Sequence, residues 1–243
     1  MPWDGPVEAV SVLGSRSAQL YAGTRGGRRS NHKQSNHSAV IGYDNSMVDS
    51  GGAVVSGLRR AMSRGDLTQA DLARALGTSA SRVSTYMTGK TVPSAALYVR
   101  ALQLGDAFAA AAARGWLTPM GAVRAVRVAV GEKDRVWGLR LILQCRDHGR
   151  AALADAVGGA VEAWTVDPGS TGAEDLDALL SGLIGREFEV ANQSVPSWAA
   201  SAGAGGPWLF ASPFFTTAEV EDATPGWLRD RGVMIAARDL VTA

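Results

Sequence analysis

Side chains that can donate hydrogen bonds gather in a five-residue stretch of this chain. They are Ser81, Arg82, Ser84 and Thr85. The residue before them, Ala80, is small, and small side chains on a helix allow its backbone to enter the major groove of DNA, which is about 12 Å wide. Arg82 would then be the one long donor within reach of a base edge. The chemistry that this stretch suggests is hydrogen bonding to DNA bases.

The residues before this stretch predict a short amphipathic helix. Thr68 is of the type that caps the start of a helix, because its hydroxyl can accept a hydrogen bond from a free backbone N–H group. Leu72, Ala73 and Leu76 recur at helical spacing and would form the buried face. We expect the other side chains to point away from that face, namely Asp71, Arg74 and Ala75.

A tight turn and a second helix follow directly. Gly77 can adopt the positive φ that ends a helix, and Ser79 is a capping residue for the next one. We expect this second helix to extend to Gly89, with Val83 and Tyr86 facing inward. That orientation leaves the hydrogen-bonding side chains on the outer face and in the exposed first turn.

This arrangement is similar to the helix-turn-helix of the lambda-repressor-like regulators, often called the XRE family, over residues 52–105. The matching positions have no gap and are Thr68, Gln69, Leu72, Ala73, Leu76, Gly77, Ser79, Val83, Tyr86, Gly89, Lys90, Pro93 and Ser94. The resemblance implies that the second helix of the motif reads bases. It also implies that the glutamine opening the first helix, here Gln69, contacts a phosphate and braces the reading helix. Lys90 would anchor a further phosphate.

The residues that we expect to contact DNA are Gln69, Ser79, Ala80, Ser81, Arg82, Ser84, Thr85 and Lys90. One position departs from the family, whose members often carry an acidic residue where this chain has Met87. The outer face is also unusually rich in Ser, Thr and Ala, which predicts modest sequence specificity or a contribution from elsewhere. Helical spacing by itself would equally fit a helical hairpin in the core of an all-α protein.

Charge is distributed unevenly along the chain, although the formal net charge is only +1. Residues 47–118 contain eight Lys or Arg and four acidic residues, whereas residues 119–243 contain eleven and sixteen. A basic segment favours contact with phosphates, and an acidic segment would be repelled by DNA. The pattern therefore favours a DNA-binding part followed by a part that contacts protein.

Composition narrows the class of protein. Hydrophobic residues make up 46% of the 243 residues, enough for a sizeable core. No apolar run approaches the roughly 20 residues that span a bilayer, so we expect no membrane segment. The single cysteine, Cys145, can form no internal disulfide, which favours a cytoplasmic location. Arg outnumbers Lys by 21 to 3, a bias that indicates a high-GC bacterial genome.

We predict an all-α fold in which a helix-turn-helix domain precedes a helical C-terminal module. Residues 1–50 have the composition of a disordered basic leader, which would either add phosphate contacts or reflect a misassigned start with translation beginning at Met47. Residues 51–117 would form the DNA-binding domain, and residues 118–191 a helical module for dimerisation or partner binding. Residues 192–243 would form an irregular segment that contains Trp.

Several local features are expected after residue 118. Residues 139–143 leave little polar face, so they should be buried in the core of a monomer or in a dimer interface. Two capping boxes are predicted, Thr171 with Glu174 and Thr216 with Glu219. We expect Glu187 on a solvated face or among helix N-terminal charges, and Trp198 at the surface. Residues 233–235 should form a short strand or an extended segment.

We interpret the chain as a sequence-specific DNA-binding transcriptional regulator, a dimeric repressor at a palindromic operator. Regulators with this domain are often encoded beside a toxin, so an antitoxin that covers a toxin with its C-terminal module is an alternative. A small-molecule sensor with an effector held among Trp137, Trp164 and Trp198 is another. The sequence contains no enzyme motif, and we expect Cys145 and His148 to be packing residues rather than a nucleophile and its base. We expect no cofactor and no metal.

Overall fold

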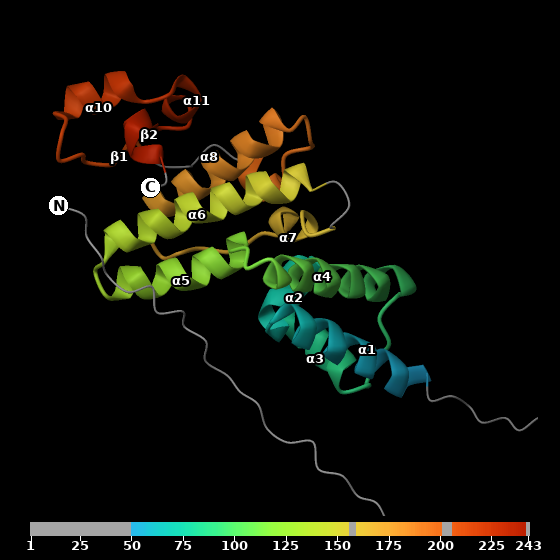
Figure 1. Ribbon diagram of the computed structural model, residues 1–243. Coiled ribbons are helices and arrows are strands. Elements are labelled where there is room, and N and C mark those ends of the chain that lie inside the picture. Colours follow the sequence, from blue (N-terminus) through green and yellow to red (C-terminus); the bar gives the residue numbers. More distant parts are fainter. Residues whose placement is uncertain (1–49, 156–158, 201–205, 242–243) are drawn as a thin grey trace, which may run out of the picture. The chain divides into compact units, whose positions relative to one another are not determined.

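The computed structural model describes residues 50–155, 159–200 and 206–241. These residues all belong to one compact unit. The expected leader, residues 1–50, lies outside the described residues apart from Ser50, which begins the first helix. Helices dominate the described residues and only two short strands accompany them, so the predicted all-α fold is confirmed (Figure 1). No helix in this part of the chain is long and apolar enough to cross a membrane.

The first four helices include the helix-turn-helix that the sequence predicted. They are α1 (Ser50–Gly65), α2 (Gln69–Ala75), α3 (Ala80–Met87) and α4 (Ala95–Ala113), and the helix-turn-helix is α2 and α3. Helix α4 lies along α1, and the two approach so closely that a Cβ added at Gly105 would be 2.7 Å from the backbone of Ala61. A small core joins them, made of Leu58, Leu72, Ala73, Val83, Tyr86, Met87 and Ala101.

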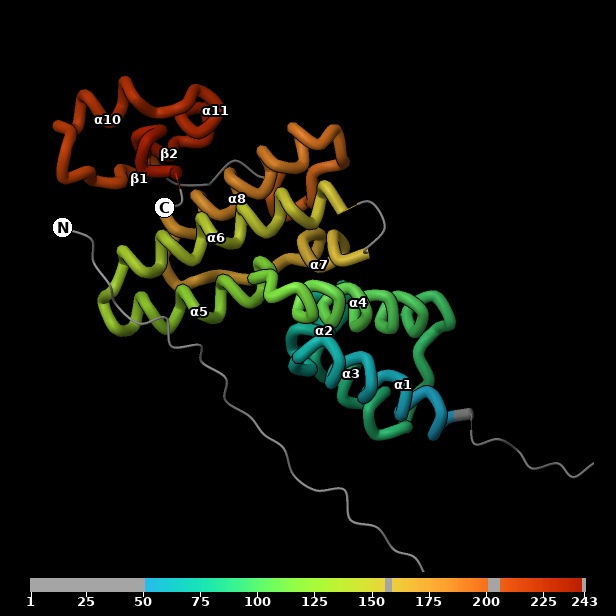
Figure 2. The backbone as a smooth tube through the Cα atoms, viewed as in Figure 1, coloured from blue at the N-terminus to red at the C-terminus, as the bar shows by residue number. Residues whose placement is uncertain are grey.

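Five further helices build the centre of the molecule, where α5, α6 and α8 lie side by side (Figure 2). They are α5 (Pro119–Gly131), α6 (Arg135–Ala154), α7 (Glu162–Thr165), α8 (Glu174–Val190) and α9 (Ser197–Ala200). Their core also includes Leu104 and Phe108 from α4. The two parts that we expected to meet near residue 117 therefore share one apolar core.

Most of the apolar stretch of α6 is covered by the chain itself, while Leu139 stays partly exposed. Leu141 is 7% exposed, Ile142 0% and Leu143 4%, and all three belong to the central core. Of the two alternatives that the sequence left open for these residues, burial within the core of one chain is the one observed. Their packing leaves no need for a second copy to cover them.

The C-terminal segment is a small, compact addition to this core. It contains β1 (Trp208–Leu209), α10 (Thr217–Ala223), α11 (Gly226–Arg229), β2 (Val233–Met234) and a 3-10 turn, Ala237–Leu240. The strands pair in parallel, and β2 confirms the expected strand. The capping box of Thr216 and Glu219 is also confirmed. Buried Arg146 on α6 holds the segment, because its Nη1 donates to the Leu240 carbonyl at 2.7 Å.

Three local expectations are wrong. Thr171 does not cap α8 in a box with Glu174, because the side chain of Asp177 accepts from the Thr171 N–H at 2.7 Å and holds the preceding loop instead. Glu187 is buried rather than solvated, and Arg150 donates hydrogen bonds to both of its carboxylate oxygens at 2.7 and 2.9 Å. Trp198 is half-buried, and its Nε1 donates to a core carbonyl.

Candidate nucleic-acid interface

Helix α2 is fixed at its start by a capping box. The Thr68 hydroxyl accepts from the Asp71 N–H at 3.1 Å, and Asp71 Oδ2 accepts from the Thr68 N–H at 3.0 Å. Thr68 is thus the N-cap that the sequence predicted. The expectation that Asp71 points away from the buried face is wrong, because its side chain is turned inward by this box and is buried. The T-x-x-D pattern in the sequence was the signal for it.

The turn between α2 and α3 is set by backbone hydrogen bonds that require a left-handed residue. Gly77 has φ 61°, its N–H donates to the Arg74 carbonyl, and the next N–H, from Thr78, donates to the Ala73 carbonyl at 2.9 Å. This pair of bonds is a Schellman motif, which glycine favours because it has no Cβ to clash. The Ser79 hydroxyl then caps α3 by accepting from the Arg82 N–H at 3.2 Å.

The inner face of α3 is anchored in the small core. Val83 and Tyr86 are buried, as expected, and Met87 joins them. The end of the helix is held by Arg59 on α1, whose Nη2 donates to the Met87 carbonyl at 3.2 Å. A cation at this position also complements the negative end of the helix. Helix α3 is therefore anchored through its inner face and at both ends, so its outer face has a fixed orientation.

Two polar side chains on that outer face are free to bind a partner. Arg82 and Ser84 are exposed, and their side chains have no hydrogen-bond or ion-pair partner among the described residues. Ala80 is exposed at the first turn and leaves room for close approach. These three positions together present one long donor and one short hydroxyl on an otherwise small surface.

The remaining hydroxyls of the expected site are already engaged within the domain. Ser79 and Ser81 share a hydrogen bond of 3.0 Å. Thr85 is only partly exposed, and its hydroxyl donates to the Arg82 carbonyl at 2.8 Å and lies 2.7 Å from that of Thr91. A hydroxyl that donates to its own helix retains only acceptor capacity. Thr85 can therefore still receive a hydrogen bond, whereas Ser84 can also give one.

Gln69 and Lys90 flank the outer face of α3 in the chain. Gln69 is the first residue of α2 and Lys90 follows the C-terminus of α3; both are exposed. A second Schellman motif fixes the backbone at Lys90, because Gly89 has φ 72° and the Lys90 N–H donates to the Thr85 carbonyl at 3.0 Å. Both side chains lack a partner in the part of the chain that the structure describes.

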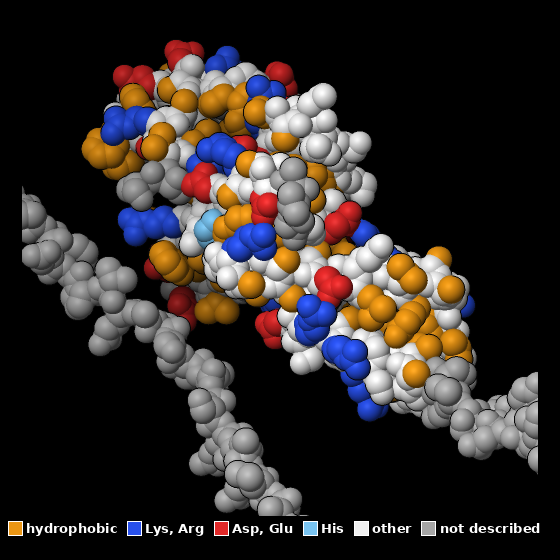
Figure 3. All heavy atoms as spheres, turned by 45° about the vertical axis from the view of Figure 1, so that its right-hand side comes forward, with side chains coloured by type: hydrophobic (Ala, Val, Ile, Leu, Met, Phe, Trp, Pro, Cys, Tyr) orange, Lys and Arg blue, Asp and Glu red, His pale blue; other side chains and the backbone are white. Residues whose placement is uncertain are grey.

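Cations of the first four helices fall into two groups. Some are neutralised by ion pairs, such as Arg64 with Asp106 at 2.6 Å and Arg100 with Glu162 at 2.5 Å. Others have no acidic partner among the described residues, and these are Arg59, Arg60, Arg82 and Lys90. Basic side chains gather along one edge of this domain in Figure 3. Arg59 and Arg60 were not among the expected site residues, and the place of Arg59 beside α3 depends on how α1 packs.

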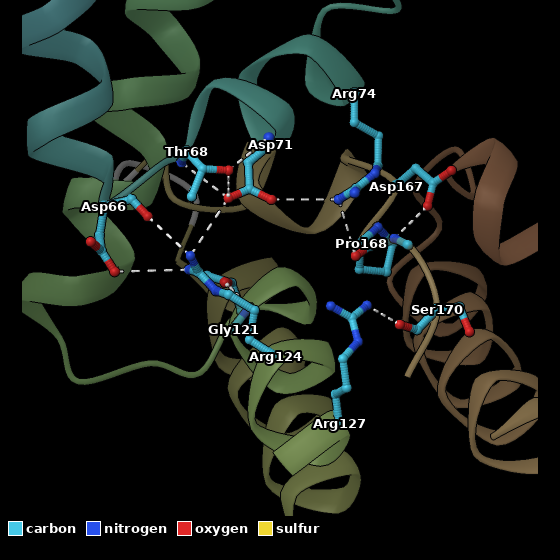
Figure 4. A network of polar contacts seen from close by, with 12 residues as sticks. Asp66, Thr68, Asp71, Arg74, Gly121, Arg124, Arg127, Asp167, Pro168 and Ser170 are labelled. Carbon is cyan, nitrogen blue, oxygen red and sulfur yellow. Dashed lines mark hydrogen bonds and ion pairs between the residues drawn. The ribbon is translucent and has the colours of Figure 1, made fainter. Parts of the chain in front are cut away.

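Helix α2 is also tied to the centre of the molecule, as Figure 4 shows. Arg124 on α5 lies 3.6 Å from Asp71 and donates to the Asp66 carbonyl at 3.3 Å. Arg74 on α2 donates to the Pro168 carbonyl at 3.3 Å in the loop before α8. Arg127, about one turn after Arg124, donates to the Ser170 carbonyl in the same loop. No local sequence pattern predicted these contacts, because the partners are far apart in the chain.

The Cys145 and His148 pair does not form a nucleophilic site. Burial raises the pKa of the Cys145 thiol, which keeps it protonated and unreactive. The His148 Nδ1 accepts from the Leu117 N–H at 2.7 Å, so that nitrogen is not available as a base. Burial also lowers the pKa of His148, with Asp147 opposing the shift. Among the described residues, no group of His, Cys, Asp or Glu is placed to hold a metal ion.

The three tryptophans expected around an effector do not surround one cavity. Trp164 is fully buried and packs edge to face against Trp116, with ring centroids 6.3 Å apart. Trp198 Nε1 donates to the Trp164 carbonyl at 3.1 Å. Trp137, by contrast, is half exposed on the outside of α6. Trp164 and Trp198 are therefore structural residues.

Comparison with known proteins supports the helix-turn-helix motif and covers no other part of the chain. A family described as a helix-turn-helix domain matches residues 56–114, which is less than half of the chain. No curated protein and no solved structure matches the chain. The matched range contains α2, the turn at Gly77 and α3, together with most of α1 and all of α4. Residues 56–114 therefore form a helix-turn-helix domain, consistent with the resemblance to the XRE-like regulators.

Proposed function

We propose that the protein is a transcriptional regulator that acts in the cytoplasm as a dimeric repressor at a palindromic operator. The observation that carries the proposal is the outer face of α3, where Arg82 and Ser84 are exposed and have no partner among the described residues. Arg82 would donate to a base edge, and a guanidinium pairs best with the two acceptors of guanine in the major groove.

In this proposal the surrounding residues bind the DNA backbone. Gln69 and Lys90 flank α3 in the chain and would each contact a phosphate, and Arg59 on α1 adds positive charge at the end of α3. Phosphate contacts position a protein without reading sequence, whereas base contacts specify it. The small number of free base-reading groups on α3 predicts a short or degenerate half-site, for which a second copy would compensate.

Selection of bound sequences from a random pool of duplex DNA tests the proposal. We expect an enriched motif with two-fold symmetry whose half-sites have centres about 34–36 Å apart, one turn of DNA. Sedimentation of the full chain should then show a dimer bound to one motif. Selection with the Arg82→Ala variant is the matched control, since it should lose enrichment at one position of each half-site. Absence of any enriched motif with the wild-type chain would contradict a sequence-specific function.

An antitoxin is the second candidate, and exposed acidic residues favour it. Four of them lie on or beside α10 and α11 and are Glu219, Glu221, Asp222 and Asp230. A basic protein surface would be attracted to this part of the C-terminal segment. Replacement of Glu221 and Asp222 by Gln and Asn should weaken such a complex and leave DNA binding unchanged. Co-purification of a basic protein with the wild-type chain and not with this variant would favour the antitoxin.

A further inference from the structure

A large groove lies between α6 and the C-terminal segment, away from the DNA-binding helices. Its volume is about 1320 Å³, somewhat above the roughly 300–1,000 Å³ of typical small-molecule sites. One wall is α6 and the start of α8, and the other is formed by residues around β1, β2 and the 3-10 turn. Apolar side chains are exposed in this upper part of the molecule, with Lys and Arg side chains among them (Figure 3).

Much of the groove is apolar. Val136, Leu139 and Leu143 form a stripe at helical spacing along α6, and the opposite wall contributes Leu209, Phe210, Phe214 and Ile235. Some of these side chains are left uncovered, since Val136 is 65% exposed and Phe214 67% exposed. An uncovered apolar surface inside a concave site favours an occupant that removes it from water.

A second stripe on α6 runs beside the apolar one and carries hydrogen-bond donors. Arg140, Gln144 and His148 all line the groove at a spacing of four residues, which covers about 12 Å of helix. The Leu117 N–H occupies His148 Nδ1, so a neutral ring carries its proton on Nε2. Within the described residues, Arg140, Gln144 and Nε2 have no protein acceptor. These donors suit a ligand with oxygen acceptors, and Arg140 suits a negative charge.

Most other charges in the groove are already neutralised. Arg135 pairs with Asp175, and Asp147 pairs with Arg146 and Arg150 outside the groove. Arg238 lies over the Phe214 ring, 4.5 Å from its centroid, and 3.9 Å from Asp239. Arg140 is therefore the cation with no acidic partner in the described lining, and a single anionic group on the ligand would complement it.

We propose that this groove binds an elongated amphiphilic anion, with its apolar body against the α6 stripe and Phe214 and its anionic group on Arg140. The ligand class is a carboxylate or sulfonate on an apolar chain or fused ring. Binding itself does not depend on the DNA-binding function. The role of the ligand as an effector does rest on the proposed function.

Hydrogen bonds connect the groove to the helix-turn-helix domain at two places. His148 holds the backbone of Leu117 in the connection between α4 and α5. Asp175, in the first turn of α8, lines the groove, and Asp177 in the same turn accepts from the Ser170 hydroxyl at 2.6 Å. Arg74 of α2 donates a hydrogen bond to the Pro168 carbonyl in this same loop. A ligand that shifts α6 or the start of α8 would thus act on the base of α2.

Binding of two related dyes tests the site in the absence of DNA. 1-Anilinonaphthalene-8-sulfonate carries a sulfonate on an aromatic body, and N-phenyl-1-naphthylamine has the same body without the charge. We expect Arg140→Gln to weaken the sulfonate dye about tenfold and the uncharged dye less than twofold. Phe214→Ala should weaken both dyes. Arg60→Gln, which removes an exposed cation of α1, is the matched control and should change neither affinity.

Two results would overturn the site: unchanged dye affinity in both Arg140→Gln and Phe214→Ala, or an equal loss in Arg60→Gln. The effector role is tested separately, by the affinity of the wild-type chain for its selected DNA with and without saturating sulfonate dye. We expect a change of at least about fivefold that Arg140→Gln abolishes. Dye binding with no effect on DNA affinity would overturn the effector role alone, and dye binding by a chain that selects no DNA motif would overturn the proposed function alone.

Discussion

Asp71 Oδ2 closes the capping box of α2 and lies 3.6 Å from the Arg124 guanidinium on α5. The Asp71 carboxylate thus caps the start of α2 and also links this helix to α5. Because α2 packs against α3, this contact helps to set the position of α3 relative to the shared core.

Replacement of Asp71 by Asn should therefore destabilise the fold. We expect a loss of roughly 1–2 kcal/mol, from a weakened cap and the loss of an ion pair whose Arg124 side is partly exposed. Thermal unfolding followed by circular dichroism should show a midpoint lower by a few °C. Asp66→Asn is the control, because the Asp66 carboxylate is fully exposed at 3.9 Å from Arg124 and its positive φ suits Asn. An equal loss in both variants would mean that charge alone, and not the cap, matters.

The parts of the site that the sequence predicted correctly are those determined by neighbouring residues. Thr68, Gly77, Ser79, Val83 and Tyr86 all act within one or two helical turns, and the structure places each as expected. Hydrophobic spacing and capping chemistry are local, so one sequence suffices to identify them.

Features that depend on distant partners could not be predicted in this way. The contact between Arg74 and the Pro168 carbonyl joins residues 94 positions apart. Likewise, the burial of Glu187 could not be predicted, because its partner Arg150 lies on another helix, 37 positions away in the chain. The capping box expected at Thr171 failed for a related reason, because Asp177 competes for the same backbone N–H group.

Arg82→Ala should weaken binding to the selected DNA motif by roughly 1–3 kcal/mol through the loss of one base contact. The fold should be unaffected, because the Arg82 side chain is exposed and has no hydrogen-bond or ion-pair partner among the described residues. Fluorescence anisotropy with the motif and with a scrambled duplex measures the difference. A loss of equal size on both duplexes would show that Arg82 contacts only phosphate.

Gln69→Ala should weaken binding without distinguishing between the two duplexes. As a phosphate contact at the start of α2, Gln69 should contribute to all duplexes alike, so both affinities should fall by a similar factor. The same anisotropy titrations, repeated from 50 to 200 mM salt, should show an unchanged salt slope because glutamine carries no charge. A loss confined to the selected motif would contradict the phosphate role.

His148 should make the stability of the fold depend on pH. Burial lowers its pKa in the folded state below the ordinary value of 6.5, so the unfolded chain binds a proton more readily. Stability is then fully present above pH 6.5 and is lost as the pH falls through the lower folded pKa. Protonation would also remove the lone pair that accepts from the Leu117 N–H.

The variant His148→Asn isolates this effect, because Asn places an acceptor at the position of Nδ1 and does not titrate. We expect the melting midpoint of the wild-type chain to fall more steeply than that of the variant between pH 7 and pH 5. Parallel curves for the two proteins would show that His148 does not contribute to the acid sensitivity.

A fragment that ends after residue 118 should be much less stable than the full chain. Leu104 and Phe108 lie on α4 within the helix-turn-helix domain, yet they pack in the core that α5, α6 and α8 complete. Removal of those helices would expose both side chains, and each costs roughly 1.5–3 kcal/mol to uncover. We therefore expect residues 47–118 to melt well below the full chain and to associate through the uncovered face.

A double variant of the fragment, Leu104→Gln with Phe108→Gln, removes the exposed apolar face and serves as the control for association. Sedimentation should show the wild-type fragment as concentration-dependent oligomers and this variant as a monomer. A wild-type fragment that is monomeric and melts with the same midpoint as the full chain would show that the helix-turn-helix domain folds independently. In that case, the shared core would not be needed to hold α2 and α3 in place.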